Sequence, residues 1–235
     1  MILAVVGGKG GVGKSTVAYN LGAALDAVVV DADLAMADLP ADRGPDLHDV
    51  LAGRADPVEA VREGGPVGLL PCGRSLAGAR ACEPTELVAA VEAVRDAYGR
   101  VVVDCPAGMC GDVGLGLLVA EACVLVTEPA PAALGDALRA RALARELDAG
   151  LAAVVLNRAR GASPTELVAR TLGGPVTTIP ESAAVADAQA AGLPVATHRP
   201  DSPAADAFAS LATTVRRTAP GAAGSESRPK TGSGP

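Results

Sequence analysis

The sequence near its beginning reads Val5-Val6-Gly7-Gly8-Lys9-Gly10-Gly11-Val12-Gly13-Lys14-Ser15-Thr16. An apolar run from Ile2 to Val6 precedes the glycines and predicts a short buried strand. Apolar residues at four-residue spacing follow them and predict a helix from Lys14 to about Leu25. A strand, a loop with the pattern Gly-x-x-x-x-Gly-Lys-Ser and a helix, in this order, are typical of a phosphate-binding loop.

The residue types in this loop suit an anion. Glycines accept positive φ angles and let the backbone approach a ligand without a Cβ in the way. Their N–H groups then converge on phosphates beside the positive end of the helix dipole. In such loops the lysine, here Lys14, bridges the β- and γ-phosphates, and the hydroxyl, here Ser15, is a ligand of Mg²⁺. The sequence therefore predicts a nucleotide-phosphate site.

Composition limits the class of protein. At 235 residues the chain is long enough for one α/β domain, and 49% of it is hydrophobic. Only three residues are aromatic, namely Tyr19, Tyr98 and Phe208, so the core must be built from Val, Leu and Ala. This core suits a parallel sheet covered on both faces. The shortage of aromatic side chains argues against nucleic-acid binding by base stacking, and the net charge of −7 opposes DNA and anionic lipid.

Two further features concern the cellular compartment. No apolar run approaches the roughly 18–20 residues of a transmembrane helix. The five cysteines are an odd number, and no signal peptide is recognisable, so we expect reduced thiols and a cytoplasmic location.

Apolar runs alternate with helical patterns along the chain. We expect strands over 27–30, 67–71, 101–104, 123–127, 151–156 and 176–180, and helices over 83–99, 132–147, 165–172, 183–191 and 203–217. Short helices are expected from Leu47 and from Val58, and an irregular segment over 72–81. The predicted fold is a three-layer α/β P-loop fold, with a mostly parallel twisted sheet between helices, over residues 1–218. Residues 219–235 lack an apolar pattern and are expected to be a disordered tail.

Aspartates follow two of these strands. Asp31 and Asp33 follow strand 27–30, and Asp104 ends strand 101–104. In an open parallel sheet, ligands bind beyond the carboxyl ends of the strands. An acid that closes a β-branched run after a phosphate loop is the Walker-B arrangement, in which a carboxylate lies near Mg²⁺. Capping of a following helix remains the alternative for all three.

The segment Lys9-Gly-Gly-Val-Gly-Lys14-Ser15-Thr16 carries the extra lysine of the deviant Walker-A ATPases. Over about residues 1–215 the chain resembles this MinD/ParA family. Asp104-Cys-Pro-Ala-Gly108 is similar to switch II of its MinD branch, and Asp31 to Leu39 is similar to switch I. Leu47 to Gly53 and the pair Ile179–Glu181 and Ala191–Val195 resemble later MinD segments.

The resemblance implies a Mg²⁺-dependent ATPase that dimerises on ATP and acts, through a regulatory partner protein, as a spatial-positioning switch. It implies that Lys9, Lys14 and Asp33 are catalytic, with Asp33 orienting water and Lys9 crossing to the partner subunit's nucleotide. Mg²⁺ would be held by Ser15, Asp33 and Asp104. The residues implied in ATP binding are Gly8, Gly10, Gly11, Val12, Gly13, Lys14, Ser15, Thr16, Asn157, Arg158 and Pro180, of which Asn157 and Arg158 would lie at the adenine.

Two alternatives remain open within this family. A ParA-like partitioning ATPase would bind DNA, with Arg139, Arg141 and Arg145 as candidate contacts. An iron protein of the nitrogenase type would hold a [4Fe–4S] cluster across a dimer axis, with Cys110 and either Cys72 or Cys82 as ligands. The remaining Cys105 and Cys123 are expected to be buried apolar residues, and His48 and His198 to be surface residues.

The chain also departs from MinD in two places. Residues 218–235 contain no Leu, Ile, Phe or Trp that could insert in a bilayer, so direct membrane binding is not expected. Phe208, Leu211 and Val215 are instead expected to pack the last helix on the sheet. Switch I contains Asp38-Leu39-Pro40 in place of the usual Asn-Leu-Asp, which favours a different partner.

Overall fold

The computed structural model describes residues 1–34, 39, 44–108 and 111–219. Seven parallel strands form one twisted sheet in the order β3-β2-β4-β1-β5-β6-β7. Their bounds are β1 Ile2–Val6, β2 Val28–Asp31, β3 Leu69–Leu70, β4 Val101–Asp104, β5 Ala122–Thr127, β6 Gly150–Ala159 and β7 Val176–Pro180. The predicted α/β fold with a parallel sheet is thus confirmed.

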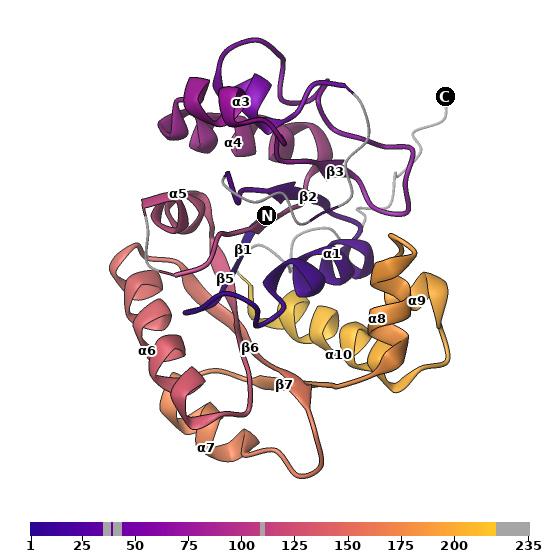
Figure 1. Ribbon diagram of the computed structural model, residues 1–235. Coiled ribbons are helices and arrows are strands. Elements are labelled where there is room, and N and C mark those ends of the chain that lie inside the picture. Colours follow the sequence, from indigo (N-terminus) through magenta and orange to yellow (C-terminus); the bar gives the residue numbers. More distant parts are fainter. Residues whose placement is uncertain (35–38, 40–43, 109–110, 220–235) are drawn as a thin grey trace, which may run out of the picture.

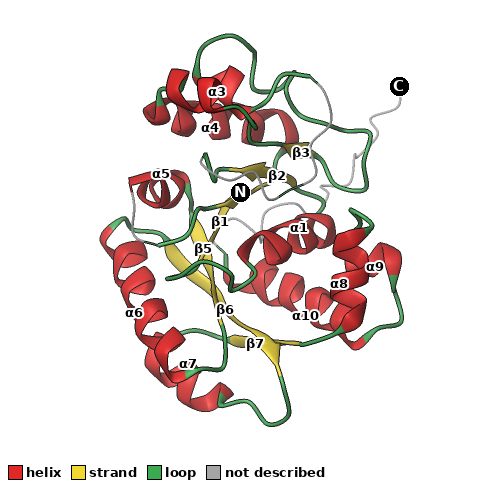
Figure 2. Ribbon diagram, viewed as in Figure 1, coloured by secondary structure: helices red, strands yellow, loops and turns green. Residues whose placement is uncertain are grey.

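Helices cover both faces of the sheet (Figure 1). They are α1 Lys14–Leu25, α2 Leu47–Leu51, α3 Leu76–Ala81, α4 Leu87–Tyr98, α5 Gly111–Val119, α6 Pro131–Glu146, α7 Thr165–Leu172, α8 Ala183–Ala190, α9 Val195–His198 and α10 Pro203–Thr218, with a 3₁₀ turn at Pro84–Glu86. Figure 2 shows the yellow strands enclosed between two groups of red helices. Parallel strands require such crossover connections, because the end of one strand and the start of the next lie at opposite edges of the sheet.

Two apolar cores result from the alternation of side chains along each strand. In β1, Leu3 and Val5 face the core beneath α1, α8, α9 and α10. The alternate residues Ile2, Ala4 and Val6 point to the opposite face, into the core beneath α2, α4, α5, α6 and α7. Both cores consist mainly of Val, Leu and Ala, as the composition predicted.

The last helix closes the first of these cores. Phe208, Leu211 and Val215 on α10 are buried as predicted. Thr218 Oγ1 also donates a hydrogen bond of 2.7 Å to the carbonyl of Ala152 in β6. The predicted tail lies outside the described residues from residue 220 onward. None of the helices in the described ranges is long and apolar enough to cross a membrane.

The structure corrects several local predictions. The segment 72–81 contains α3, because the Ser75 hydroxyl caps its first turn by accepting the Gly78 N–H. The predicted helix from Val58 is only a hydrogen-bonded turn, closed by the contact from Ala60 N to the Asp56 carbonyl. Helices α5 and α9 were not predicted.

His48 is also corrected, since it is only 3% exposed and not a surface residue. Its Nε2 lies 3.1 Å from the carbonyl oxygen of Leu34 and 3.4 Å from Cys72 Sγ. Two glycines leave room for the ring, because a Cβ on Gly73 or Gly78 would lie 2.2 or 2.9 Å from His48 Nδ1. The isolated histidine gave no periodic signal of this burial.

Candidate nucleotide-binding site

The glycine-rich loop joins β1 to α1 at the carboxyl edge of the sheet. Gly11 and Gly13 adopt φ angles of 79° and 92°, which glycine accepts at little cost. Gly13 is the N-cap of α1 and supplies no side chain to cap it, so the first backbone N–H groups of the helix are available to a ligand. Lys14, the first residue of α1, is only 7% exposed. The loop has the backbone geometry of an anion-binding site.

Two residues of β6 hold this loop in place through hydrogen bonds. Asn157 Nδ2 donates a hydrogen bond of 2.8 Å to the carbonyl of Val12, and Arg158 Nη1 donates one of 2.8 Å to that of Gly11. A Cβ on Gly13 would lie 2.2 Å from Asn157 Nδ2, so only glycine fits here. In this conformation the Asn157 amide nitrogen is hydrogen-bonded to the loop. That Asn157 contacts the adenine of ATP stays a prediction.

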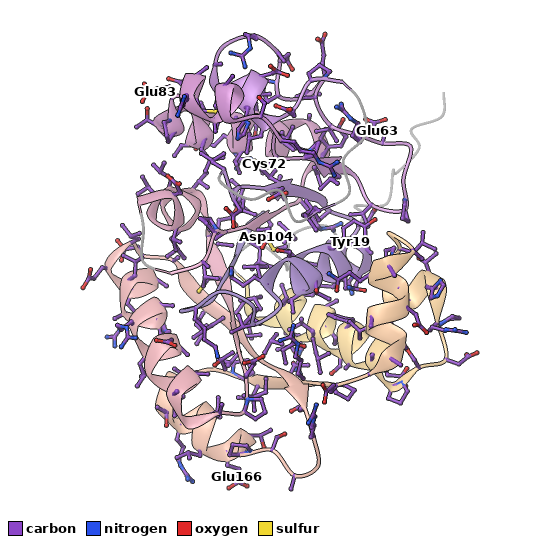
Figure 3. The ribbon with its side chains drawn as sticks, viewed as in Figure 1. Tyr19, Glu63, Cys72, Glu83, Asp104 and Glu166 are labelled. Carbon is purple, nitrogen blue, oxygen red and sulfur yellow. The ribbon has the colours of Figure 1, made fainter. Side chains whose placement is uncertain are left out.

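Three carboxyl groups gather beside the loop. The register of β2 and β4 places Asp31 opposite Asp104, and the Asp33 N–H donates to Asp31 Oδ1 at 3.3 Å. Asp104 is 1% exposed, and Figure 3 shows it near the centre of the molecule. Burial raises the pKa of Asp104 to about 8, assisted by Asp31 and opposed chiefly by a hydrogen bond from the Ser15 hydroxyl.

The buried Asp104 carboxyl and the Ser15 hydroxyl together fit a divalent cation. Asp104 Oδ1 is buried and has no hydrogen-bond partner among the described residues. Carboxylate and hydroxyl oxygens are the ligands that Mg²⁺ prefers, and a cation here would also offset the repulsion between Asp104 and Asp31. Lys14 and Ser15 of the glycine-rich loop and Asp104 of the second motif therefore lie together, since both loop residues act on the Asp104 carboxyl.

A cavity of about 440 Å³ opens beside the loop. Its described lining contains three cationic residues, Lys14, Arg74 and Arg158, and no carboxylate. A surface of this charge in a chain of net charge −7 favours a polyanion. Among the predicted residues, Gly11, Gly13, Lys14, Ser15, Thr16 and Arg158 line it, whereas Lys9, Gly8, Gly10, Val12, Asp33, Asp104, Asn157 and Pro180 do not.

The cavity also includes residues that the sequence did not single out. Arg74 follows β3, and Val185 and Gln189 belong to α8. Tyr19 of α1 joins them and donates from its hydroxyl to the carbonyl of Gly192 at 2.9 Å. Arg74 could have been found from its place just beyond a strand's carboxyl end; the α8 residues carried no such signal.

Lys9 lies outside this lining and pairs with an acid. Its Nζ is 3.3 Å from Glu128 Oε2, and Arg158 Nη1 is 2.9 Å from Glu128 Oε1. The sequence did not predict this role of Glu128.

Comparison with known proteins agrees with this geometry. The family described as the CobQ/CobB/MinD/ParA nucleotide binding domain matches residues 3–195. The chain belongs to this family.

Individual relatives of this MinD/ParA-family chain point the same way. An uncharacterised ATP-binding protein of Methanocaldococcus jannaschii is 36% identical over 227 residues, which cover 89% of this chain and 85% of that protein. The cell division ATPase MinD of Pyrococcus furiosus is similar in structure, with a TM-score of 0.86 and 31% identity over 93% of this chain and 99% of its own. MinD of Pyrococcus horikoshii, solved with Mg-ADP, has a TM-score of 0.84 and 30% identity over 91% and 95% of the two chains.

The structure also bears on the residues named for the two alternatives within the family. Among the cysteines named as cluster ligands, Cys110 lies outside the described residues, so the cluster stays a prediction. Cys72 is buried, which raises its thiol pKa. Arg139 pairs with Asp136 on its own helix, and Arg141 donates to the Leu172 carbonyl, so only Arg145 of the three arginines forms no such contact with the described residues. Cys105 and Cys123 are buried, as predicted.

Proposed function

We propose that this MinD/ParA-family protein is a Mg²⁺-dependent ATPase that dimerises on ATP and acts as a nucleotide-dependent positioning switch. The observation that carries the proposal is the meeting of Lys14, Ser15 and the buried Asp104 beside a cavity lined by cations. The likeness to MinD structures supports the positioning role.

The chain's own residues would divide the work as follows. The N–H groups of the loop and Lys14 would bind the phosphate chain. Ser15 and Asp104 would hold Mg²⁺ together with Asp33, and the bound ion would neutralise charge on the phosphate oxygens. Asp33 would orient a water for in-line attack on the γ-phosphate. Hydrolysis of this kind is slow until a further group completes the site.

Lys9 would complete the site in a second subunit. It is 42% exposed by side chain and lies outside the cavity of its own subunit. A cation supplied in trans can be worth about 10³–10⁵ in rate where it completes a phosphoryl-transfer site. An ATP-dependent dimer would therefore be the active form, and a regulatory protein that recognises it would set the time of hydrolysis.

The test is the solution mass of the protein by sedimentation. Asp33→Ala should double in mass with ATP, because this variant cannot hydrolyse ATP and its dimer therefore does not dissociate. With ADP it should remain a monomer. Lys14→Ala should bind neither nucleotide, and Lys9→Ala should bind ATP without dimerising. A monomeric Asp33→Ala protein at saturating ATP would contradict the proposal. An ATP-dependent, salt-sensitive shift of a DNA duplex would instead favour the partitioning role.

A further inference from the structure

Glu128 stands at the carboxyl end of β5, the strand next to β1 and its glycine-rich loop. One of its carboxylate oxygens faces Lys9 and the other faces Arg158, at 3.3 and 2.9 Å. The Glu128 side chain is 22% exposed, so the pair with Lys9 is partly shielded from water. The carbonyl of Glu128 also accepts the Ala130 N–H in the turn that leads to α6, which fixes its backbone.

Lys9 is consequently held on its own subunit. Its ammonium group lies on the side of the loop that faces β5, away from the lining of the nucleotide cavity. A lysine that is to contact the nucleotide of a second subunit must first leave this carboxylate.

We propose that Glu128 is a positioning residue that retains Lys9 in the monomer and thereby sets the ATP concentration at which the protein dimerises. The inference rests on the proposed function, since it requires that Lys9 acts across a dimer interface.

Arg158 keeps the Glu128 carboxylate in place. Its guanidinium donates hydrogen bonds both to Glu128 and to the carbonyl of Gly11. The backbone of Arg158 has a positive φ of 53°, which is uncommon for a residue with a Cβ. When Lys9 leaves, Glu128 keeps Arg158 as its counter-charge. Release therefore breaks one ion pair and leaves no isolated carboxylate, which makes the exchange readily reversible.

The size of the effect follows from the number of pairs broken. Partly exposed ion pairs are weak, but each dimer breaks two of them. We expect Glu128→Gln, in the Asp33→Ala background, to raise the association constant of the ATP dimer about fivefold to thirtyfold, equivalent to roughly 1–2 kcal/mol. The measurement is sedimentation over a series of ATP concentrations.

A matched variant serves as the control for this experiment. Glu146→Gln removes the same charge from the exposed end of α6 and should leave dimerisation unchanged. If Asp33→Ala itself stays monomeric, the proposed function and this inference both fail. If it dimerises and Glu128→Gln has the same or a lower association constant, only the inference fails.

A second measurement does not depend on dimerisation. The chain has three lysines, Lys9, Lys14 and Lys230. Acylation by an acetic acid active ester, followed by mass spectrometry of the nucleotide-free protein, should label Lys9 several-fold faster in Glu128→Gln than in the unchanged protein, relative to Lys230. Equal labelling of Lys9 in the two proteins would contradict the retention of Lys9 by Glu128. This conclusion holds however strongly the variant dimerises.

Discussion

At the scale of single residues, Arg74 offers the sharpest test of the cavity. It lines the cavity together with Lys14 and forms no hydrogen bond or ion pair within the described residues. We expect Arg74→Ala to weaken ATP binding about fivefold, which is the worth of one exposed charge-assisted contact. Titration calorimetry with Mg-ATP measures this. Arg80→Ala, an exposed arginine on α3 outside the lining, is the matched control, and an equal loss in both variants would contradict the assignment.

Asp104 should make the stability of the metal-free protein depend on pH. The pKa of Asp104 is about 8 in the folded protein and near its ordinary value of 3.8 in the unfolded chain. Between these two pH values, folding therefore takes up a proton at Asp104. Stability from this group is therefore greatest below about pH 4 and is lost progressively as the pH rises to about 8. Asp104→Asn removes this dependence. The melting temperature of Asp104→Asn minus that of the unchanged protein, measured by calorimetry in EDTA, should increase from pH 5 to 8 and then level off. A difference that stays constant over this range would contradict the prediction.

Residues differed in how well the sequence predicted them. Lys14, Ser15 and Asp104 belong to short patterns that specify their place at a strand end, and the structure brings them together. Glu128 lies far along the chain from Lys9, and no local pattern links the two. Pairs of this kind follow from the order of strands in the sheet, which the sequence did not specify.

At the scale of elements, the contact between α2 and the loop after β3 depends on Gly73. A Cβ there would lie 2.2 Å from His48 Nδ1 and 2.5 Å from its Cγ. We expect Gly73→Ala to lower the free energy of unfolding by about 1–3 kcal/mol through overpacking. In the His48→Ala background the loss should shrink by at least about 1 kcal/mol, because the clashing ring is gone. Denaturant unfolding of the four proteins gives this coupling.

A glycine in open space provides the comparison for this cycle. A Cβ on Gly64 would meet none of the described residues within 4 Å, so Gly64→Ala should cost the same small amount in both backgrounds. Should Gly73→Ala cost equally with and without His48, the packing of the imidazole would not be the reason for the glycine.

Prediction of elements succeeded where periodicity was strong. Helix 165–172 and strand 176–180 were predicted with the bounds that the structure has. Helix α5 was missed because three glycines, Gly111, Gly114 and Gly116, weaken its signal. Gly116 is needed for packing, since a Cβ there would lie 2.6 Å from Cys105 Sγ. Tertiary contacts, and not helix propensity, account for this element.

At the scale of the whole molecule, charge is distributed unevenly. The chain has a net charge of −7, yet its cavity presents three cations and no carboxylate among the described lining residues. The three acids lie next to this cavity, where Ser15 joins the lining to Asp104. This separation suits a ligand that is itself a polyanion with a divalent cation at one end, as Mg-ATP is.

We propose that the folded domain ends close to residue 218, and α10 makes this testable. Phe208, Leu211 and Val215 are each at most 2% exposed. Burial of three such side chains is worth about 5–9 kcal/mol, comparable with the total stability of about 5–15 kcal/mol of a typical domain. A chain that stops after Ser202 should therefore lose cooperative unfolding.

A chain that stops after Ala219 should behave differently. It retains all of α10, the hydrogen bond of 2.6 Å from Arg216 Nη2 to the Ala24 carbonyl at the end of α1, and every described residue of the nucleotide cavity. Its melting temperature and its affinity for Mg-ATP should equal those of the full chain, as measured by scanning and titration calorimetry. A fall in affinity alone would show that residues 220–235 contribute to nucleotide binding, and a fall in melting temperature would place the end of the folded domain beyond Ala219.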